Sequence, residues 1–328
     1  MTVGNTGGQQ FSGPAIANIT DLLERLSVAT AYSLPQSAVP RRTRLARRGL
    51  FARYLLLTPA TALLAFTLAA PLALLVLYSF WTQRGLVIDT QLTLAEYAAV
   101  LTRKIYLVVF LRSLAISSAA ALLAILLAYP VAYFIAFRAK AKFIWLLLVT
   151  IPFWTSYLLR VFAWKVILGF NGVINSTLTG LHLVSAPLSI LLYNPWAVLI
   201  TLVHGYAAFA ILPIFVALEK LDPALLEAAA DLGDPPFWRF VRITLPLSLT
   251  GVLAAFVLIF IPATGDYVTP SLVGGPEGLM IANLIQVQFG RVDNWPLGAA
   301  LAITTIVLVA FAALLVAGCA RLIAARIR

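Results

Sequence analysis

Six long apolar runs, separated by polar and charged stretches, dominate the pattern of residues along this chain. Each run is close to or above the roughly 20 residues that a helix needs to cross the hydrocarbon core of a bilayer. The runs lack the alternation of barrel strands, and backbone in lipid must satisfy its own hydrogen bonds, so they predict helices. The predicted transmembrane spans are 54–83, 113–137, 143 to about 160, 196–218, 243–265 and 297–320.

The composition of the chain agrees with a membrane location. Of its 328 residues, 62% are hydrophobic and 11% are charged, whereas soluble domains have about 45–50% apolar and about 25% charged residues. So few charges could not keep the remaining apolar surface wet. This composition excludes a water-soluble globular protein and predicts an all-α integral membrane protein with about six transmembrane helices.

Positive charges predict the orientation of the spans. The chain has 23 Lys and Arg against 12 Asp and Glu, a formal net charge of +11, but these cations gather beside the apolar runs. They are therefore interpreted as topology signals and not as a surface for nucleic acid. With both termini in the cytoplasm, 16 of the 23 cations fall on the cytoplasmic side. The chain is predicted to be a multi-pass membrane protein, in contact with the lipid bilayer and with an N-in/C-in topology.

The chain is predicted to have one membrane domain after a polar tail. Residues 1–50 include a stretch rich in Gly, Ser, Gln and Thr and are predicted to be a flexible cytoplasmic tail. Residues 51–328 are predicted to form the transmembrane domain, whose longest cytoplasmic link covers residues 219–242.

Motifs that carry catalytic chemistry do not occur in the sequence. It contains no glycine-rich phosphate loop, no H-E-x-x-H and no C-x-x-C. The two histidines, His182 and His204, have no obvious acidic neighbours, which argues against a metal site or an acid–base pair. We therefore expect no catalytic residue and no metal ligand, and we expect that this chain alone does not hydrolyse nucleotides.

The longest cytoplasmic link contains the start and stop signals of two short helices. Asp222 can cap a helix whose first residue is Pro223, and Gly233 can take the left-handed conformation that ends this helix. Asp234 is predicted to cap a second helix that starts at Pro235. The link is therefore expected to be a pair of helices and not an extended loop.

The first of these helices is predicted to dock onto another protein. Its small residues, Ala228 to Ala230, allow a partner surface to approach closely. The flanking acids Glu227 and Asp231 can fix the register of that contact. The alternative is a solvated amphipathic link without a partner.

The same link resembles a known family signature. Glu227-Ala228-Ala229, Gly233, Ile243 and Leu245-Pro246 match every position of the EAA signature of permease subunits of ABC importers. The resemblance implies a fold like that of type I ABC importer permeases, with a coupling helix that sits in a groove of a cytoplasmic ATPase. The predicted ATPase-coupling residues are Glu227, Ala228, Ala229, Asp231, Gly233, Ile243, Leu245 and Pro246.

The resemblance extends to permeases of the spermidine/putrescine type. It is carried by IPFWTSYLLRVFAW at 151–164, FIPATGDYVTPSLVGGP at 260–276 and NWPLGAALAI at 294–303. It implies polyamine import across a bacterial cytoplasmic (inner) membrane. The transporter would have two ABC ATPase subunits, a second and homologous permease subunit and a periplasmic solute-binding protein. ATP and Mg would then bind to the ATPase, and this chain would bind no cofactor.

The residues themselves give partial support to a polyamine path. A flexible, multiply charged cation is stabilised by carboxylates and by aromatic faces. Trp and Tyr also anchor membrane interfaces, and Arg160 could instead pair with Asp266 and join two helices. Arg160 near the path would repel a cation, which leaves an organic anion or an amino acid-like solute open. The candidate path residues are Trp154, Tyr157, Arg160, Tyr206, Asp266 and Tyr267.

The main rival function is a secondary carrier driven by an ion gradient. Such a carrier needs acids within the membrane for proton or sodium coupling, and it typically contains internal repeats. Neither is evident in the sequence. The permease of an ABC importer is therefore the leading interpretation.

Overall fold

Helix α2, Arg42–Tyr78, is the first element of the part of the chain that the structure describes. The computed structural model describes residues 42–85 and 87–327, and it describes the side chains of residues 58–85 and 87–318. The predicted tail lies outside the described residues up to residue 41, and helix α2 begins within the predicted range 1–50. The chain divides into two units, residues 1–68 and 69–328.

In the first unit, helix α2 presents apolar side chains on its surface. Leu63, Leu64 and Phe66 are 65%, 61% and 70% exposed. The Thr67 hydroxyl donates to the carbonyl of Leu63 at 2.8 Å, so this polar group is satisfied within the helix. Exposed apolar side chains and internally satisfied polar groups are what a lipid-facing helix requires.

The prediction of six membrane-spanning segments is confirmed. Among the described residues, six helical segments are long and apolar enough to cross a membrane. The second is longer than predicted, because helix α4 starts at Lys104 and not at Ser113. The observed segments are 58–78, 104–137, 157–180, 195–219, 236–264 and 295–318.

The third predicted span is wrong in its bounds. The structure has helix α5, Lys142–Thr150, then a 3-10 turn η1, Ile151–Trp154, and then a new helix α6, Tyr157–Leu168. Pro152 lacks the amide that would continue α5. Thr155 is extended, and its hydroxyl donates to the Pro152 carbonyl at 2.6 Å. One apolar run therefore contains a break between two helices.

The prediction of an all-α chain misses one β-hairpin. Strands β1, Thr82–Arg84, and β2, Val87–Asp89, pair antiparallel with Gln83 opposite Ile88. The first predicted span extends too far, because Gln83 lies in β1 and not in helix α2. The side-chain amide of Gln83 donates to the carbonyl of Asp293 at 2.6 Å. This bond ties the hairpin to the segment just before the last helix.

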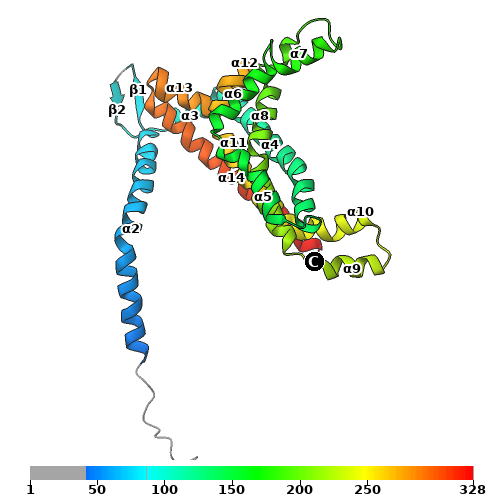
Figure 1. Cartoon of the computed structure of the whole chain (residues 1–328). Helices are drawn as coiled ribbons and strands as arrows, with labels where there is room; N and C mark the ends of the chain where they lie inside the picture. Colours follow the sequence, from blue (N-terminus) through cyan, green and yellow to red (C-terminus); the bar gives the residue numbers. More distant parts are fainter. Residues whose placement is uncertain (1–41, 86, 328) are drawn as a thin grey trace, which may run out of the picture. The chain divides into compact units, whose positions relative to one another are not determined.

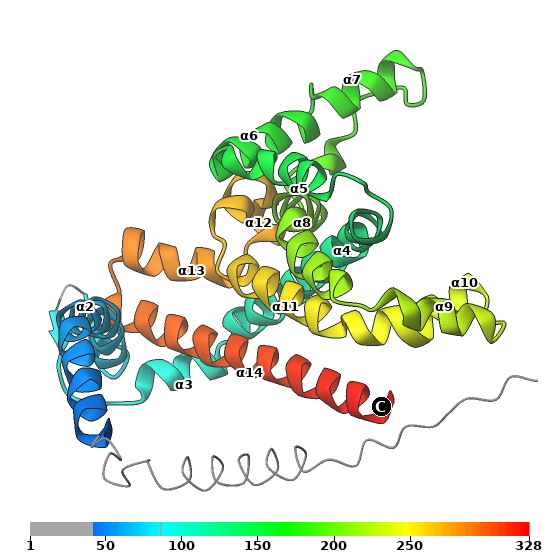
Figure 2. The same cartoon turned by 60° about the horizontal axis from the view of Figure 1, so that its bottom comes forward.

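The core of the second unit lies where helix α4, Lys104–Phe137, meets α8, Pro195–Glu219, and α11, Leu245–Thr264. The three helices lie side by side in Figure 1 and Figure 2. Every fourth residue on the inner side of α4, from Ala120 to Ala132, is alanine and is essentially inaccessible to solvent. Such small side chains let helix backbones approach closely, which favours association within a membrane.

Short helices and turns connect and flank these spans. In Figure 2, α13 runs beside α14, and in Figure 1, α9 and α10 lie at the end of the core helices opposite α7. The remaining elements are α3 (Ala95–Thr102), α7 (Val173–Gly180), η2 (Ser189–Leu191), α9 (Pro223–Asp231), α10 (Pro236–Arg239), the π-helical turns η3 (Phe240–Thr244), η4 (Pro270–Gly274) and η5 (Gln288–Val292), α12 (Gly275–Gly278), α13 (Ile281–Val287) and α14 (Trp295–Ile327).

Candidate functional site

Helix α9 forms as the sequence predicts. The Asp222 side chain accepts the backbone N–H of Ala224 at 3.0 Å, and Pro223 is the first helical residue. This bond satisfies one of the free N–H groups at the helix start. Gly233 follows the helix with a φ of +88°, a left-handed conformation that glycine adopts without strain. Local capping therefore defines both ends of the predicted docking helix.

The prediction that Asp234 caps the second helix is wrong. Helix α10 begins one residue later than predicted, with Pro235 in the capping position and without a side-chain cap. Asp234 instead forms an ion pair with Arg242 at 3.0 Å. The Arg242 guanidinium also lies 4.7 Å from the ring centroid of Trp238. A cation within reach draws the Asp234 carboxylate away from the free N–H groups of α10.

Two arginines link α9, α10 and the turn that leads into α11. The Arg239 side chain donates from Nη1 to the carbonyl of Leu226 at 3.4 Å, so it bridges α10 and α9. Arg242 belongs to the π-helical turn η3, which leads directly into α11. The two short helices and the start of α11 are thus linked by side-chain contacts as well as by the chain.

The predicted coupling residues divide into exposed and packed groups. Glu227, Ala228, Asp231, Gly233 and Leu245 are exposed, whereas Ile243 and Pro246 are half-buried. Ala229 is buried, so its methyl group packs within the loop and does not face outward. Of the predicted coupling residues on α9, the two acids and Ala228 therefore face outward.

Sequence reasoning missed an apolar residue on this surface. Leu232 is 88% exposed at the end of α9. Leu225 and Phe237 are also exposed, at 49% and 68%. The sequence did offer a signal for this exposed residue, because Leu232 directly precedes Gly233, the glycine that ends the helix. Exposed large apolar side chains next to acids are typical of a protein-binding surface.

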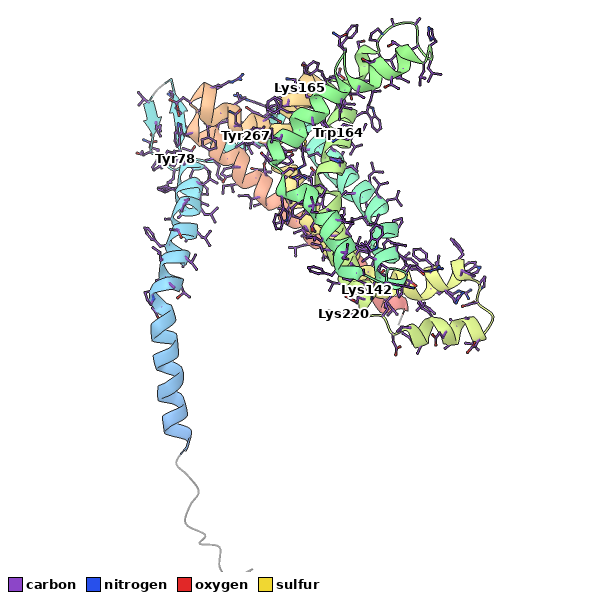
Figure 3. All side chains as sticks on the ribbon, in the orientation of Figure 1. Tyr78, Lys142, Trp164, Lys165, Lys220 and Tyr267 are labelled. Atoms are coloured by element: carbon purple, nitrogen blue, oxygen red, sulfur yellow. The ribbon has the colours of Figure 1, made fainter. Side chains whose placement is uncertain are left out.

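An ion pair lies beside the start of this loop. Lys142 Nζ, at the start of α5, lies 3.3 Å from a carboxylate oxygen of Glu219, at the end of α8. Figure 3 labels Lys142 close to Lys220, which follows Glu219. Both partners of the pair are partly exposed, so it contributes little free energy of folding but fixes two helix ends near each other.

A second polar cluster lies at the other end of α11. The Tyr157 hydroxyl donates to Oδ2 of Asp266. Oδ1 of the same carboxylate accepts the backbone N–H groups of Val268 at 2.8 Å and Thr269 at 3.2 Å. Asp266 is 7% exposed. Its carboxylate is therefore buried and already holds three donors from this chain.

The suggested pairing of Arg160 with Asp266 is not found. Arg160 Nη1 donates to the carbonyl of Gly205 at 3.1 Å, and no described ion pair joins it to Asp266. Its guanidinium carbon lies 5.0 Å from the ring centroid of Phe153 and 5.7 Å from that of Tyr157. The Arg160 guanidinium therefore contacts two aromatic faces and a carbonyl, while its buried Nε has no hydrogen-bond partner among the described residues.

The structure brings together four of the six candidate path residues. The rings of Tyr157 and Tyr206 lie 6.2 Å apart between centroids, next to the contacts of Arg160 and Asp266. Trp154 stays apart on turn η1 and is 85% exposed. Tyr267, labelled in Figure 3, is about half exposed, and no side-chain hydrogen bond joins it to this cluster among the described residues.

Asn283 is a buried polar residue that sequence reasoning missed. Its side-chain amide donates to the Tyr267 carbonyl at 2.8 Å and to the Ser271 hydroxyl at 2.7 Å, and its carbonyl oxygen accepts the N–H of Met280 at 3.0 Å. These bonds clamp the segment that follows Asp266. An asparagine inside the apolar stretch MIANLIQV was the available signal.

Metal ligands do not gather in the described part of the chain. No group of three or more His, Cys, Asp or Glu side chains there could hold a metal ion. His204 instead packs against Trp164, with 5.5 Å between the ring centroids.

A family model and several characterised proteins match this chain. Residues 120–328 match the model described as the binding-protein-dependent transport system inner membrane component. The chain is 38% identical over 249 residues to the spermidine/putrescine transport system permease protein PotB of Haemophilus influenzae, covering 75% of this chain and 86% of the relative. It is 32% identical over 237 residues to the inner membrane ABC transporter permease protein YdcU of Escherichia coli, covering 68% and 74%.

Solved structures share the fold. A chain of a bacterial alginate ABC transporter, in complex with an alginate pentasaccharide-bound periplasmic protein, aligns with a TM-score of 0.66. The alignment covers 87% of this chain and 99% of that chain, at 17% sequence identity. A second alginate ABC transporter structure aligns with a TM-score of 0.64 over 86% of this chain and 99% of the other, also at 17% identity. At this identity the likeness concerns the fold alone.

Proposed function

Because the chain belongs to the family of inner membrane components of binding-protein-dependent transport systems, we propose that it carries polyamines as the permease subunit of an ATP-driven importer. Membership in this family makes the chain a multi-pass transport component of the bacterial inner membrane and not an enzyme. The predicted fold class, a helical membrane protein like type I ABC importer permeases, is confirmed by the shared fold.

The likeness to PotB is the single observation that carries the polyamine assignment. It extends over 75% of this chain and 86% of the Haemophilus influenzae relative at 38% identity. The relative is named for spermidine and putrescine, and we extend that substrate class to this chain. A secondary carrier is not favoured, because the relatives are permeases of ABC transport systems.

The surface of α9 and α10 supports coupling to an ATPase. Glu227 and Asp231 are exposed acids on α9, and Leu232 adds exposed apolar area beside them. Apolar contact contributes affinity, and the charges at its edge fix the register. We place one of two cytoplasmic ATPase subunits on this surface. ATP and Mg would bind to the ATPase subunits, and this chain would bind neither.

The attachment of α9 and α10 to α11 offers a route for the movement. Closure of the ATPase dimer around ATP would shift α9. The Arg239 bond to Leu226 and the Asp234–Arg242 ion pair would pass this shift to η3 and so to α11. Because α11 packs on α4 and α8, the core would change its packing against a second permease subunit. The path between the two subunits would then open alternately to each side, and hydrolysis would reset it.

On this account, this chain supplies aromatic faces to the polyamine path but few negative charges. Tyr157 and Tyr206 lie close together in the outer cluster. The Asp266 carboxylate is buried and occupied by donors of the same chain, so it positions the turn after α11 and does not bind the cation. Arg160 repels a cation at this level. We infer that the second permease subunit and the periplasmic binding protein supply the carboxylates for the ammonium groups.

ATP hydrolysis by the reconstituted complex tests this function. The binding protein is presented with spermidine, putrescine, amino acids or organic anions. We expect stimulation by the polyamines only. We expect Glu227→Lys to abolish it, because the charge reversal disrupts docking. Glu277→Lys is the matched control, since Glu277 is an exposed glutamate on α12 at the other end of α11.

The outcomes of this assay separate the two parts of the proposal. Stimulation only by another solute class would contradict polyamine transport and keep the importer. Absence of stimulation with every loaded binding protein would contradict the importer itself.

A further inference from the structure

An open groove lies in the second unit between the start of α4 and the segment that includes α12 and α13. Its volume is about 410 Å³. One wall is the α4 face that carries Lys104, Ile105, Val108 and Arg112, and the opposite wall includes Leu279 and Leu284. None of these residues belongs to the surface of α9 and α10 or to the polar cluster around Asp266.

Two cations line the groove without counterions. Within the described side chains, neither Lys104 nor Arg112 has an ion pair or a hydrogen bond. They are eight residues apart on one helix, which places their Cα atoms about 12 Å apart along the axis. Arg112 is partly buried and belongs to a helix apolar enough to span the membrane. A partly buried positive charge in such a helix is costly unless an anion compensates it.

The surface between the two cations is apolar. Ile105 is 59% exposed and Val108 is 41% exposed, and both face the groove. Leu279 and Leu284 continue this apolar surface on the opposite wall. A small inorganic anion would satisfy the charges but would leave these side chains uncovered. A ligand with both an anionic group and a hydrocarbon chain matches the whole groove.

The position of the groove along the helix identifies the source of such a ligand. The predicted N-in/C-in orientation places the start of α4 at the outer face of the membrane. Lys104 then lies at the level of the outer headgroups, and Arg112 lies deeper, toward the acyl chains. Long cationic side chains at this level can extend toward a phosphate while their stems contact hydrocarbon.

We propose that this groove binds an anionic glycerophospholipid of the outer leaflet. Its phosphate is held by Lys104 and Arg112, and an acyl chain lies along Ile105, Val108 and Leu284. The bound lipid supplies the counterion that Arg112 lacks. The site is independent of the transported solute, because two cations repel a polyamine.

Native mass spectrometry of the full chain in detergent tests the site. The probes are phosphatidylglycerol, phosphatidylcholine with the same acyl chains, and inorganic phosphate. We expect phosphatidylglycerol to bind most tightly. We expect Arg112→Gln to weaken its binding about fivefold to tenfold, since one cation near a lipid surface contributes about 1 kcal/mol. Lys104→Gln, at the exposed end of the helix, is a second variant with little risk to folding.

Arg84→Gln is the matched control, because Arg84 is an exposed cation at the end of β1 outside the groove. It should leave phosphatidylglycerol binding unchanged. Equal binding of both lipids, or equal effects of all three variants, would overturn the proposal. Displacement of the lipid by millimolar phosphate would instead indicate a site for free anions. Loss of the phosphatidylglycerol preference in the complex with the second permease subunit would indicate that a protein covers the groove.

Discussion

At the scale of single residues, Asp266 shows what sequence alone could and could not predict. From the sequence it is a candidate path residue, with pairing to Arg160 as the alternative, and the structure shows it buried near the end of α11. Two of its hydrogen-bond donors, the backbone N–H groups of Val268 and Thr269, lie two and three residues after it. Such bonds are expected from local turn geometry. The third donor, Tyr157, is 109 residues away, so only the packing of α6 against the turn reveals it.

Tyr157→Phe should lower the stability of the chain. The substitution keeps the ring but removes the donor to a buried carboxylate, which typically costs about 1–3 kcal/mol of unfolding free energy. Thermal unfolding of the purified chain in detergent measures this as a lower Tm. Tyr267→Phe is the control, because Tyr267 makes no described side-chain hydrogen bond. An unchanged Tm for Tyr157→Phe would show that the bond to Asp266 contributes nothing.

The carboxyl group of Glu96, on helix α3, is expected to make the stability of the chain depend on pH. Burial raises the pKa of its carboxyl above the ordinary value, and nearby Arg103 opposes this only in part. A raised pKa in the folded state means that the charged form is disfavoured, so stability is lost as the pH rises through that pKa. Glu96→Gln should therefore raise the Tm at pH 8 relative to the unmodified chain. The difference should vanish near pH 4, and a difference that grows toward low pH would contradict this account.

At the scale of elements, the features that depend on neighbouring residues in the sequence were predicted best. The cap at Asp222 and the glycine after α9 depend on neighbours in sequence, and both are found. The break at Pro152 could not be distinguished from a kink, because membrane helices often tolerate proline. The β-hairpin is joined to the segment before α14 by the bond from Gln83 to Asp293, which are 210 residues apart. Polar contacts of such separation carry no signal in the hydropathy pattern.

Gly251 predicts a strong effect on helix packing. A Cβ at this position would lie 2.5 Å from both the Pro213 carbonyl oxygen and the Ala217 methyl group, so α11 could not approach α8 as closely. Gly251→Ala should cost about 1–3 kcal/mol, the usual range for overpacking. The measurement is thermal unfolding in detergent, with Gly180→Ala as control because a Cβ there meets nothing within 4 Å. Equal Tm values for the two variants would contradict the close contact.

At the scale of the whole molecule, the number of spans and the membrane location were predicted from composition and run length. These properties depend on the total apolar length, which packing does not alter. The pair of helices in the link 219–242 was predicted from local capping signals and is found as α9 and α10, and its coupling to an ATPase stays a proposal. The role of the candidate path residues stays a prediction, since a path between two permease subunits would depend on residues that this chain does not contain. The orientation, with both termini inside, stays a prediction from the charge distribution.

ATP-dependent uptake of labelled spermidine into proteoliposomes tests the central claim most directly. The vesicles contain the complete complex with ATP on the side of the α9–α10 loop, and the loaded binding protein is on the other side. We expect uptake that requires ATP hydrolysis, persists when ion gradients are dissipated and is abolished by Glu227→Lys. Uptake that continues without ATP and is driven by an imposed ion gradient would contradict the account.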